Sequence, residues 1–137
     1  MTGNAIVYLL DTDTCVFALR HRDCVLRRLR PLSPDDVAVA TMTEAEPLFG
    51  ALGSRDPARA RTSVLAFLEP IARLPFDSAA AEQHARIRYD LRPQPIGERD
   101  AVIAATALAG ALIVVTHNTR EFARVAGLAH EDWVEPG

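Results

Sequence analysis

The apolar run Ala5-Ile-Val-Tyr-Leu-Leu10 is followed at once by Asp11-Thr-Asp13, and this junction decides the fold. A continuous apolar run of this length, with Ile and Val in it, predicts a strand that is buried on both faces. A second run, Leu112-Ile-Val-Val-Thr116, shortly precedes Asn118 near the other end of the chain. Two such strands are typical of the centre of a parallel sheet that helices cover on each side.

Periodicity and capping signals divide the remaining sequence into helices that alternate with short strands. The predicted strands are 5–11, 36–41, 71–76, 111–116 and 132–134; the predicted helices are 13–30 (in two pieces), 43–52, 56–68, 78–91, 98–110 and 119–122. Thr43 is the expected N-cap of helix 43–52, which would place Glu46 at its third position in a capping box. The pattern predicts an α/β fold of three layers, α/β/α, with a central, mainly parallel sheet of about five strands.

Length and composition are those of one folded domain, expected to span residues 1–137. The chain has 49% hydrophobic and 24% charged residues. No apolar stretch approaches the roughly 20 residues that a membrane-spanning helix needs. The N-terminus has neither the basic segment nor the cleavage site of a secretion signal, so we expect a cytoplasmic protein without a membrane partner. Cys15 and Cys24 are accordingly expected to be reduced rather than disulfide-bonded.

The positive charge of this sequence is carried by arginine alone. All 15 cationic side chains are Arg, and the formal net charge of −3 argues against bulk attraction to nucleic acid. Five of them cluster within a short segment that contains a single acid, Asp23: Arg20, Arg22, Arg27, Arg28 and Arg30. The planar guanidinium group matches phosphate in a bidentate manner. The cluster is therefore either a solvated helix surface or a surface that contacts phosphate.

Acidic side chains stand where the predicted strands and helices meet. Asp11 ends the first strand, Glu46 and Asp100 lie near the starts of predicted helices, and Asn118 follows the strand 111–116. In parallel sheets, ligands bind beyond the carboxyl ends of the strands, so these side chains are expected to share one region. Hard cations such as Mg²⁺ are held by oxygen ligands. The pattern favours metal-assisted hydrolysis.

Each of these residues also has a purely structural interpretation. Asp11 can cap a helix, Asp100 suits the dipole of a first helical turn, and Asn118 suits a turn. Three further residues either orient the carboxylates or only cap a helix and end strands: Asp13, Thr12 and Thr116. His117, next to Asn118, is a less favoured candidate for a general base.

Five stretches of the sequence, in order, resemble one known family. They are Tyr8-Leu-Leu-Asp-Thr-Asp13, Thr43-Glu-Ala-Glu-Pro-Leu-Phe-Gly50, Pro95-Ile-Gly-Glu-Arg-Asp-Ala-Val-Ile-Ala-Ala105, Val115-Thr-His-Asn-Thr-Arg-Glu-Phe122, and Val125-Ala-Gly-Leu128 with Glu131-Asp-Trp133. Together they cover nearly the whole chain. The sequence resembles the PIN-domain ribonucleases, and within them the VapC-type toxins of bacterial toxin–antitoxin pairs.

The resemblance implies a site and a set of partners. Asp11, Glu46 and Asp100 match the metal-binding acids of the family, and Asn118 takes a fourth position that is Asp in many members. The implied activity is that of a Mg²⁺-dependent endoribonuclease, with Mn²⁺ able to substitute, which hydrolyses RNA phosphodiester bonds with metal-activated water. The implied assembly is a homodimer that a small VapB-like antitoxin inhibits, in a heterotetramer or a larger complex.

The sequence departs from the family pattern in three places. Asp13 stands where Asn is common, Pro47 follows Glu46 where an aliphatic residue is usual, and Glu98-Arg99 precedes Asp100 where less charged residues are frequent. Pro47, together with Asn118 at the fourth position, leaves open a degenerate PIN domain that binds RNA or the antitoxin without turnover.

A second alternative is an enzyme of another class. The segment Leu9-Leu-Asp-Thr-Asp-Thr14 also resembles the opening motif of haloacid-dehalogenase-type phosphatases, with Asp11 as the nucleophile and Asp13 as the acid/base. That superfamily also needs a cationic group for the phosphoryl moiety and paired acids after a later strand. Lys is absent, and Thr116-His-Asn118 stands where the paired acids would be. The phosphatase is therefore the less favoured interpretation.

Overall fold

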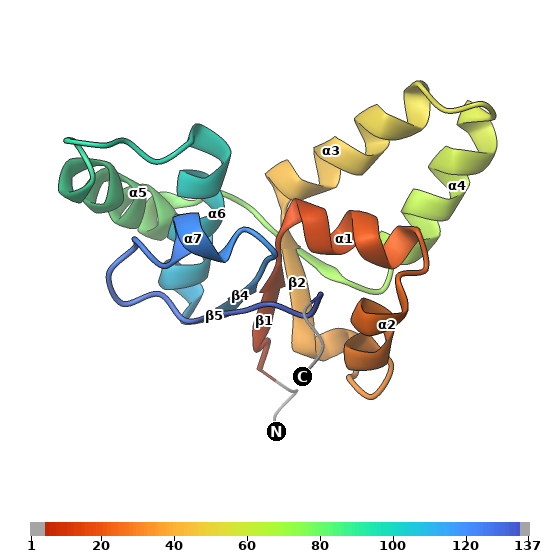
Figure 1. The fold of residues 1–137 in the computed structure, drawn as a ribbon, viewed down its shortest axis with the longest axis horizontal. Helices are drawn as coiled ribbons and strands as arrows, with labels where there is room; N and C mark the ends of the chain where they lie inside the picture. The colour runs from red at the N-terminus through yellow and green to blue at the C-terminus, as the bar shows by residue number, and fades with distance from the viewer. Residues whose placement is uncertain (1–4, 135–137) are drawn as a thin grey trace.

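A parallel sheet of five strands lies at the centre of the computed structural model, which describes residues 5–134 (Figure 1). Its strands are β1 (Tyr8–Leu10), β2 (Val37–Ala40), β3 (Ala72–Leu74), β4 (Ile113–Val115) and β5 (His130–Glu131). They lie in the order β3-β2-β1-β4-β5, and each neighbouring pair is parallel. Both apolar runs of the sequence thus form central strands, and the predicted α/β class is confirmed. The expected domain also took in residues 1–4 and 135–137, which lie outside the described residues.

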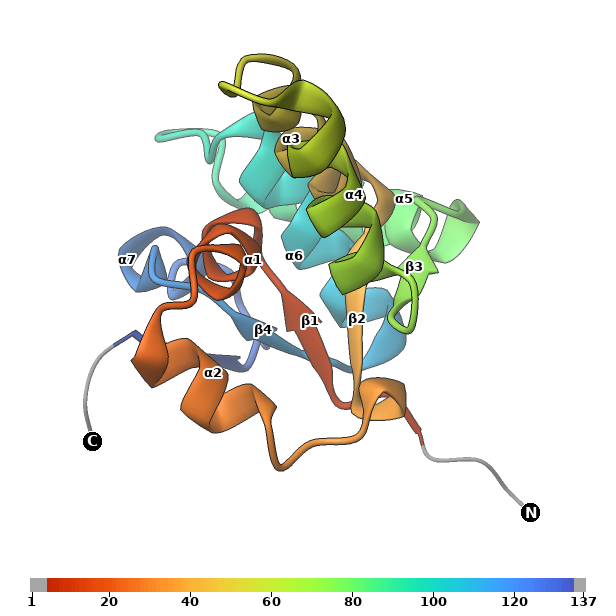
Figure 2. The ribbon, with the colours of Figure 1, turned by 90° about the vertical axis from the view of Figure 1, so that its right-hand side faces the viewer.

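Helices cover both faces of this sheet. They are α1 (Thr12–Leu19), α2 (Asp23–Leu29), α3 (Thr41–Leu52), α4 (Pro57–Leu68), α5 (Ser78–Asp90), α6 (Glu98–Gly110) and α7 (Thr119–Phe122), and a short 3-10 helix, η1 (Pro34–Asp36), precedes β2. Figure 2 shows α1, α2 and α4 in front of the sheet, with α5 and α6 behind it. Because side chains alternate along a strand, Leu9 faces the α5–α6 layer and Leu10 faces the α1–α2–α4 layer.

The start of α3 differs from the prediction. The helix begins at Thr41, directly after β2, with Ala40 as its N-cap. Glu46 is therefore the sixth helical residue, and the predicted capping box with Thr43 is wrong. The hydroxyl of Thr43 is buried without a hydrogen-bond partner among the described residues. Pro47 consequently lies inside the helix, where it cannot donate to the carbonyl of Thr43.

The other element boundaries agree more closely with the sequence. Asp56 and Asp77 cap α4 and α5 through their side chains, next to the predicted helix starts at 56 and 78. The last strand is His130–Glu131 rather than 132–134, because Trp133 turns into the core and donates from Nε1 to Glu131. The described cysteines are free, as expected. Within residues 5–134, no helix is both long and apolar enough to cross a membrane.

Candidate active site

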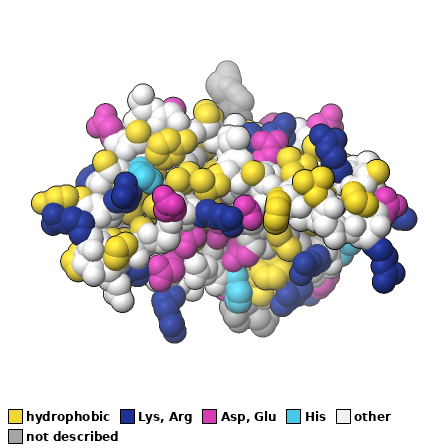
Figure 3. Space-filling view, turned by 90° about the horizontal axis from the view of Figure 1, so that it is seen from above, with side chains coloured by type: hydrophobic (Ala, Val, Ile, Leu, Met, Phe, Trp, Pro, Cys, Tyr) yellow, Lys and Arg dark blue, Asp and Glu magenta, His cyan; other side chains and the backbone are white. Residues whose placement is uncertain are grey.

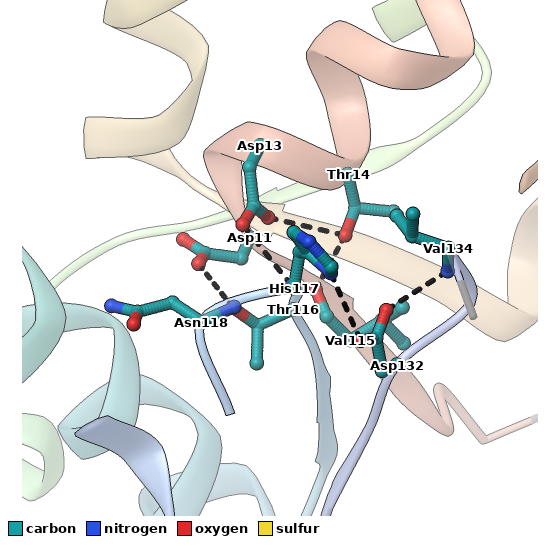
Figure 4. Close-up of polar contacts among 9 residues, drawn as sticks. All are labelled: Asp11, Asp13, Thr14, Val115, Thr116, His117, Asn118, Asp132 and Val134. Carbon is teal, nitrogen blue, oxygen red and sulfur yellow. Dashed lines mark hydrogen bonds and ion pairs between the residues drawn. The ribbon is translucent and has the colours of Figure 1, made fainter. Parts of the chain in front are cut away.

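Asp11 leaves the carboxyl end of β1, where the neighbouring strand β4 fixes its backbone. Its N–H donates to the carbonyl of Val115 at 2.8 Å. The carboxylate accepts from the N–H of Thr12 at 2.8 Å and from the hydroxyl of Thr116 at 2.7 Å, and the residue is only 6% exposed. Figure 4 shows this carboxylate among polar side chains from the ends of β1 and β4. The pairing of two buried strands therefore delivers an acid to an enclosed position.

Thr116 connects Asp11 to Asn118 through hydrogen bonds. While its hydroxyl donates to Asp11, the same oxygen accepts from the N–H of Asn118 at 2.9 Å. The orienting role expected of Thr116 thus has a direct structural basis. Thr12 also contacts the Asp11 carboxylate, but through its backbone N–H and not through its side chain.

Asp13 lies in the first turn of α1 and bonds to the segment that follows β4. One carboxylate oxygen accepts from the N–H of His117 at 3.1 Å, and the other accepts from the hydroxyl of Thr14 at 3.3 Å. The ring of His117 is held in turn, because its Nδ1 lies 3.0 Å from Asp132. The alternative in which Asp13 only caps the helix is wrong, because the N-cap of α1 is Asp11, and Asp13 instead joins α1 to the loop that carries Asn118.

Asp100 and Asn118 meet from two different elements. The side-chain amide of Asn118 donates from Nδ2 to Asp100 in the first turn of α6, at 3.2 Å. Asn118 occupies the N-cap position of α7 but makes no side-chain cap there. Its amide therefore serves Asp100 instead of the helix that it precedes.

Burial and mutual repulsion make the charged form of these acids unfavourable. Burial, with the charge of Asp13 as the next cause, raises the pKa of Asp11 to about 6. Burial also raises the pKa of Asp13. The pKa of Asp100 is raised by burial and, to a smaller extent, by the nearby charges of Glu121 and Asp13. Within residues 5–134, none of Asp11, Asp13 and Asp100 forms an ion pair with a cationic side chain. Among the described residues, no cationic side chain is paired with their negative charge.

Glu46 differs from the other predicted site residues. It faces α6, where its Oε1 lies 3.0 Å from Nη1 of Arg99. Over the part of the chain that the structure describes, no three His, Cys, Asp or Glu side chains are grouped closely enough to hold a metal ion. Hydrogen bonds link Asp11 through Thr116 to Asn118 and Asp100, and Asp13 to His117, while Glu46 is paired with Arg99. Figure 3 shows acidic side chains gathered near the middle of the face seen from above, with cationic side chains among them.

One neighbour of the site was missed by the sequence analysis. Glu121 in α7 raises the pKa of Asp100 and is paired with Arg124 at 2.9 Å. Its spacing of three residues from Asn118 was the available signal, because such residues share one side of a helix.

Some arginines of the cluster at residues 20–30 are engaged in contacts within the protein itself. Arg27 pairs with Asp23, and Arg28 pairs with Glu131 at 3.1 Å. Arg22 lies over the ring of Phe17, 5.1 Å from its centroid. These contacts favour the structural interpretation for three of the five arginines.

Replacing Thr116 by Val should weaken both the fold and its response to Mg²⁺. The change removes one of the two hydrogen bonds to the Asp11 carboxylate and leaves the Asn118 N–H without its acceptor, which costs about 1–3 kcal/mol. Thr106→Val is the control, because it removes an equally buried hydroxyl that bonds only to the carbonyl of Val102. Thermal unfolding with Mg²⁺ and with EDTA would show the metal-dependent shift reduced in Thr116→Val alone. An equal reduction in both variants would contradict the orienting role.

Comparison with known proteins identifies the class of this fold and site. Residues 6–128 match the model of the PIN domain, and the chain belongs to the PIN-domain family. The tRNA(fMet)-specific endonuclease VapC of Shigella flexneri is 37% identical over 128 residues, which cover 92% of this chain and 97% of that protein. The VapC relatives place this chain among the VapC-type members of the family.

Solved structures agree with this result. A DNA-bound VapBC structure from Salmonella typhimurium superimposes with a TM-score of 0.86 at 33% identity, covering 93% of this chain and 98% of that chain. VapBC2 from Rickettsia felis, bound to a DNA fragment from its promoter, has a TM-score of 0.85 at 27% identity, with 93% and 99% covered. The resemblance noted in the sequence is confirmed, and the phosphatase alternative loses its support.

Proposed function

We propose that this chain is a divalent-metal-dependent endoribonuclease and the toxin of a toxin–antitoxin pair. The observation that carries the proposal is the meeting of Asp11, Asp13 and Asp100 with Asn118 beyond the ends of β1 and β4. Burial raises the pKa of all three acids, and neighbouring carboxylates add to the rise for Asp11 and Asp100; a bound cation would favour their charged forms. A structural role alone does not require three such carboxylates in one place, because burying them is costly.

The donors at this site suit a hard divalent cation. Asp11, Asp100 and Glu46 would hold it, with Asp13 and Asn118 beside them, and Mg²⁺ is the proposed ion with Mn²⁺ as a substitute. Glu46 would first have to leave Arg99. When bound, such an ion makes water nucleophilic near neutral pH and stabilises the charge of the leaving oxygen.

The protein's own groups prepare the site for this chemistry. The bonds from Thr12 and Thr116 hold Asp11 in one orientation, and His117 fixes Asp13 through its backbone N–H. Asn118 donates to Asp100 and so keeps a carboxylate from α6 beside those from the sheet. Such preorganisation means that little rearrangement of these groups is needed during reaction.

The names of the relatives suggest a first substrate to test. VapC of Shigella flexneri and of Salmonella typhimurium, at 37% and 34% identity, are each called tRNA(fMet)-specific endonucleases. We therefore propose initiator tRNA as the first candidate. Solved relatives in VapBC complexes support a small VapB-like antitoxin as the partner. A homodimer, a heterotetramer or larger complex with antitoxin, and a cytoplasmic location complete the proposal.

Removal of the metal should abolish cleavage. Purified, antitoxin-free protein would be incubated with initiator tRNA and with total RNA, in Mg²⁺, in Mn²⁺ or in EDTA. Discrete fragments are expected only with a divalent ion, with a loss of at least about 100-fold in EDTA, because the ion contributes several kcal/mol. Cleavage that persists in EDTA would contradict the metal requirement. Folded protein that binds RNA but cleaves none would support the degenerate PIN domain that Pro47 and Asn118 leave open.

A further inference from the structure

Arg99 lies beside Asp100 in the first turn of α6, and its guanidinium reaches across to α3. There, Nη1 lies 3.0 Å from Oε1 of Glu46, and the two side chains are 63% and 27% exposed. An acid proposed as a metal ligand is thus already paired with a cation that belongs to the protein.

The other acids of the site are in the opposite situation. Asp11, Asp13 and Asp100 have no ion-pair partner within residues 5–134. Two of them, Asp11 and Asp13, repel each other, and Asp13 also repels Asp100. Of the acids named as site residues, which are Asp11, Asp13, Glu46 and Asp100, Glu46 is therefore the one that is paired with a cationic side chain among the described residues.

We propose that Arg99 competes with the divalent cation for Glu46, and that it acts as an internal counterion of the metal-free site. This inference rests on the proposed metal site. Arg99 is largely exposed and Glu46 is partly exposed, and ion pairs open to solvent are weak, so a divalent ion can displace the guanidinium from Glu46. Metal affinity is then lowered by the cost of breaking the pair, and α3 stays tied to α6 while no metal is bound.

The same helix offers a matched control. Glu44 on α3 is paired with Arg73, with Nε of the arginine 3.6 Å from Oε2. Arg73→Gln and Arg99→Gln each remove one positive charge that is paired with a glutamate of α3. Arg73→Gln, however, frees Glu44, which is not part of the proposed site. A general effect of net charge on metal binding would appear in both variants.

The test is a titration of metal-free protein with Mn²⁺, measured by isothermal titration calorimetry. This readout reports metal binding and does not depend on RNA cleavage. Wild type, Arg99→Gln, Glu46→Gln, the double variant and Arg73→Gln would be compared after circular dichroism has shown that each is folded. We expect Arg99→Gln to bind Mn²⁺ about two- to five-fold more tightly, the range that an exposed ion pair supplies. In the Glu46→Gln background, the substitution of Arg99 should change nothing.

Three results would overturn the competition. Unchanged or weaker Mn²⁺ binding by Arg99→Gln would show that Arg99 does not oppose the metal, or that it positions Glu46 for it. Tightening that persists in Glu46→Gln, or that Arg73→Gln reproduces, would reveal an effect of net charge only. Failure of the wild-type protein to bind Mn²⁺ would instead overturn the metal site, and the competition with it.

Discussion

Replacing Asp100 by Asn should reduce the rate of RNA cleavage by about 100- to 1000-fold while leaving the protein folded. The substitution removes one negative oxygen donor from the proposed site, and a bound divalent ion contributes several kcal/mol to this kind of reaction. Asp100 is in the first turn of α6, and the amide of Asn118 can still bond to the oxygen of the new side chain. The rate would be measured on initiator tRNA at saturating Mg²⁺.

The control for this loss is Glu121→Gln. Burial is the main cause of the raised pKa of Asp100 and the charge of Glu121 is the next, but the Glu121 carboxylate is paired with Arg124. Glu121→Gln removes one negative charge near α6, as Asp100→Asn does. Because Glu121 is not a proposed metal ligand, we expect its variant to cleave at a rate within about three-fold of wild type. Equal losses in both variants would show that cleavage depends on net charge near α6, not on Asp100 as a ligand.

Replacing Asp11 by Asn should stabilise the metal-free protein at neutral pH. Burial raises the pKa of Asp11 to about 6, above the value of about 3.9 for an unfolded chain. The folded state therefore binds the proton more tightly than the unfolded state, so the destabilisation caused by ionising Asp11 grows from about pH 4 to about pH 6 and is complete above that range. Two pKa units correspond to about 3 kcal/mol, so the variant should gain on the order of 2 kcal/mol at pH 7.5. The expected gain in stability is about 2 kcal/mol, not the full value of about 3 kcal/mol, because the new amide cannot accept both of the hydrogen bonds that the carboxylate accepts.

The same reasoning sets the pH dependence. In EDTA, the free energy of unfolding of the wild-type protein should receive a contribution from Asp11 that rises as the pH falls from about 6 to about 4. That contribution is absent from Asp11→Asn, so the difference between the two proteins should shrink across this window. Urea unfolding at several pH values would measure it. A variant less stable than wild type at pH 7.5 would contradict the origin of the raised pKa.

Mg²⁺ should make the wild-type protein more stable than Asp11→Asn, the reverse of their order in EDTA. A ligand that binds only the folded state raises the free energy of unfolding, and this gain depends on its affinity. Wild type would gain stability with added Mg²⁺, whereas Asp11→Asn, which lacks a proposed ligand, would gain little. A mutation that stabilises the free protein while abolishing its response to the metal is expected where a charged site was assembled for binding.

Much of the fold could be predicted because its signals are local. The continuous apolar run before Asp11 indicated a strand buried on both faces, and the structure places it as the central strand β1. Asp77 signalled the start of a helix through its own side chain. The start of α3 was misplaced because Thr43 has the form of an N-cap, while the chain turns from β2 into the helix at Thr41 with no loop. A hydroxyl that suits a cap was instead buried in the helix.

The sequence by itself determined the two central strands, the alternation of strands and helices, and the acids at their ends. These depend on side-chain periodicity and on groups a few residues apart. Only the tertiary structure decided that Thr116 bonds to Asp11, that Asn118 bonds to Asp100, and that Arg99 engages Glu46. Each of these contacts joins different elements, and hydrogen bonds and ion pairs act over a few ångströms. Burial and mutual proximity, which raise the pKa of Asp11, likewise exist only after the strands have paired and the helices have packed on them.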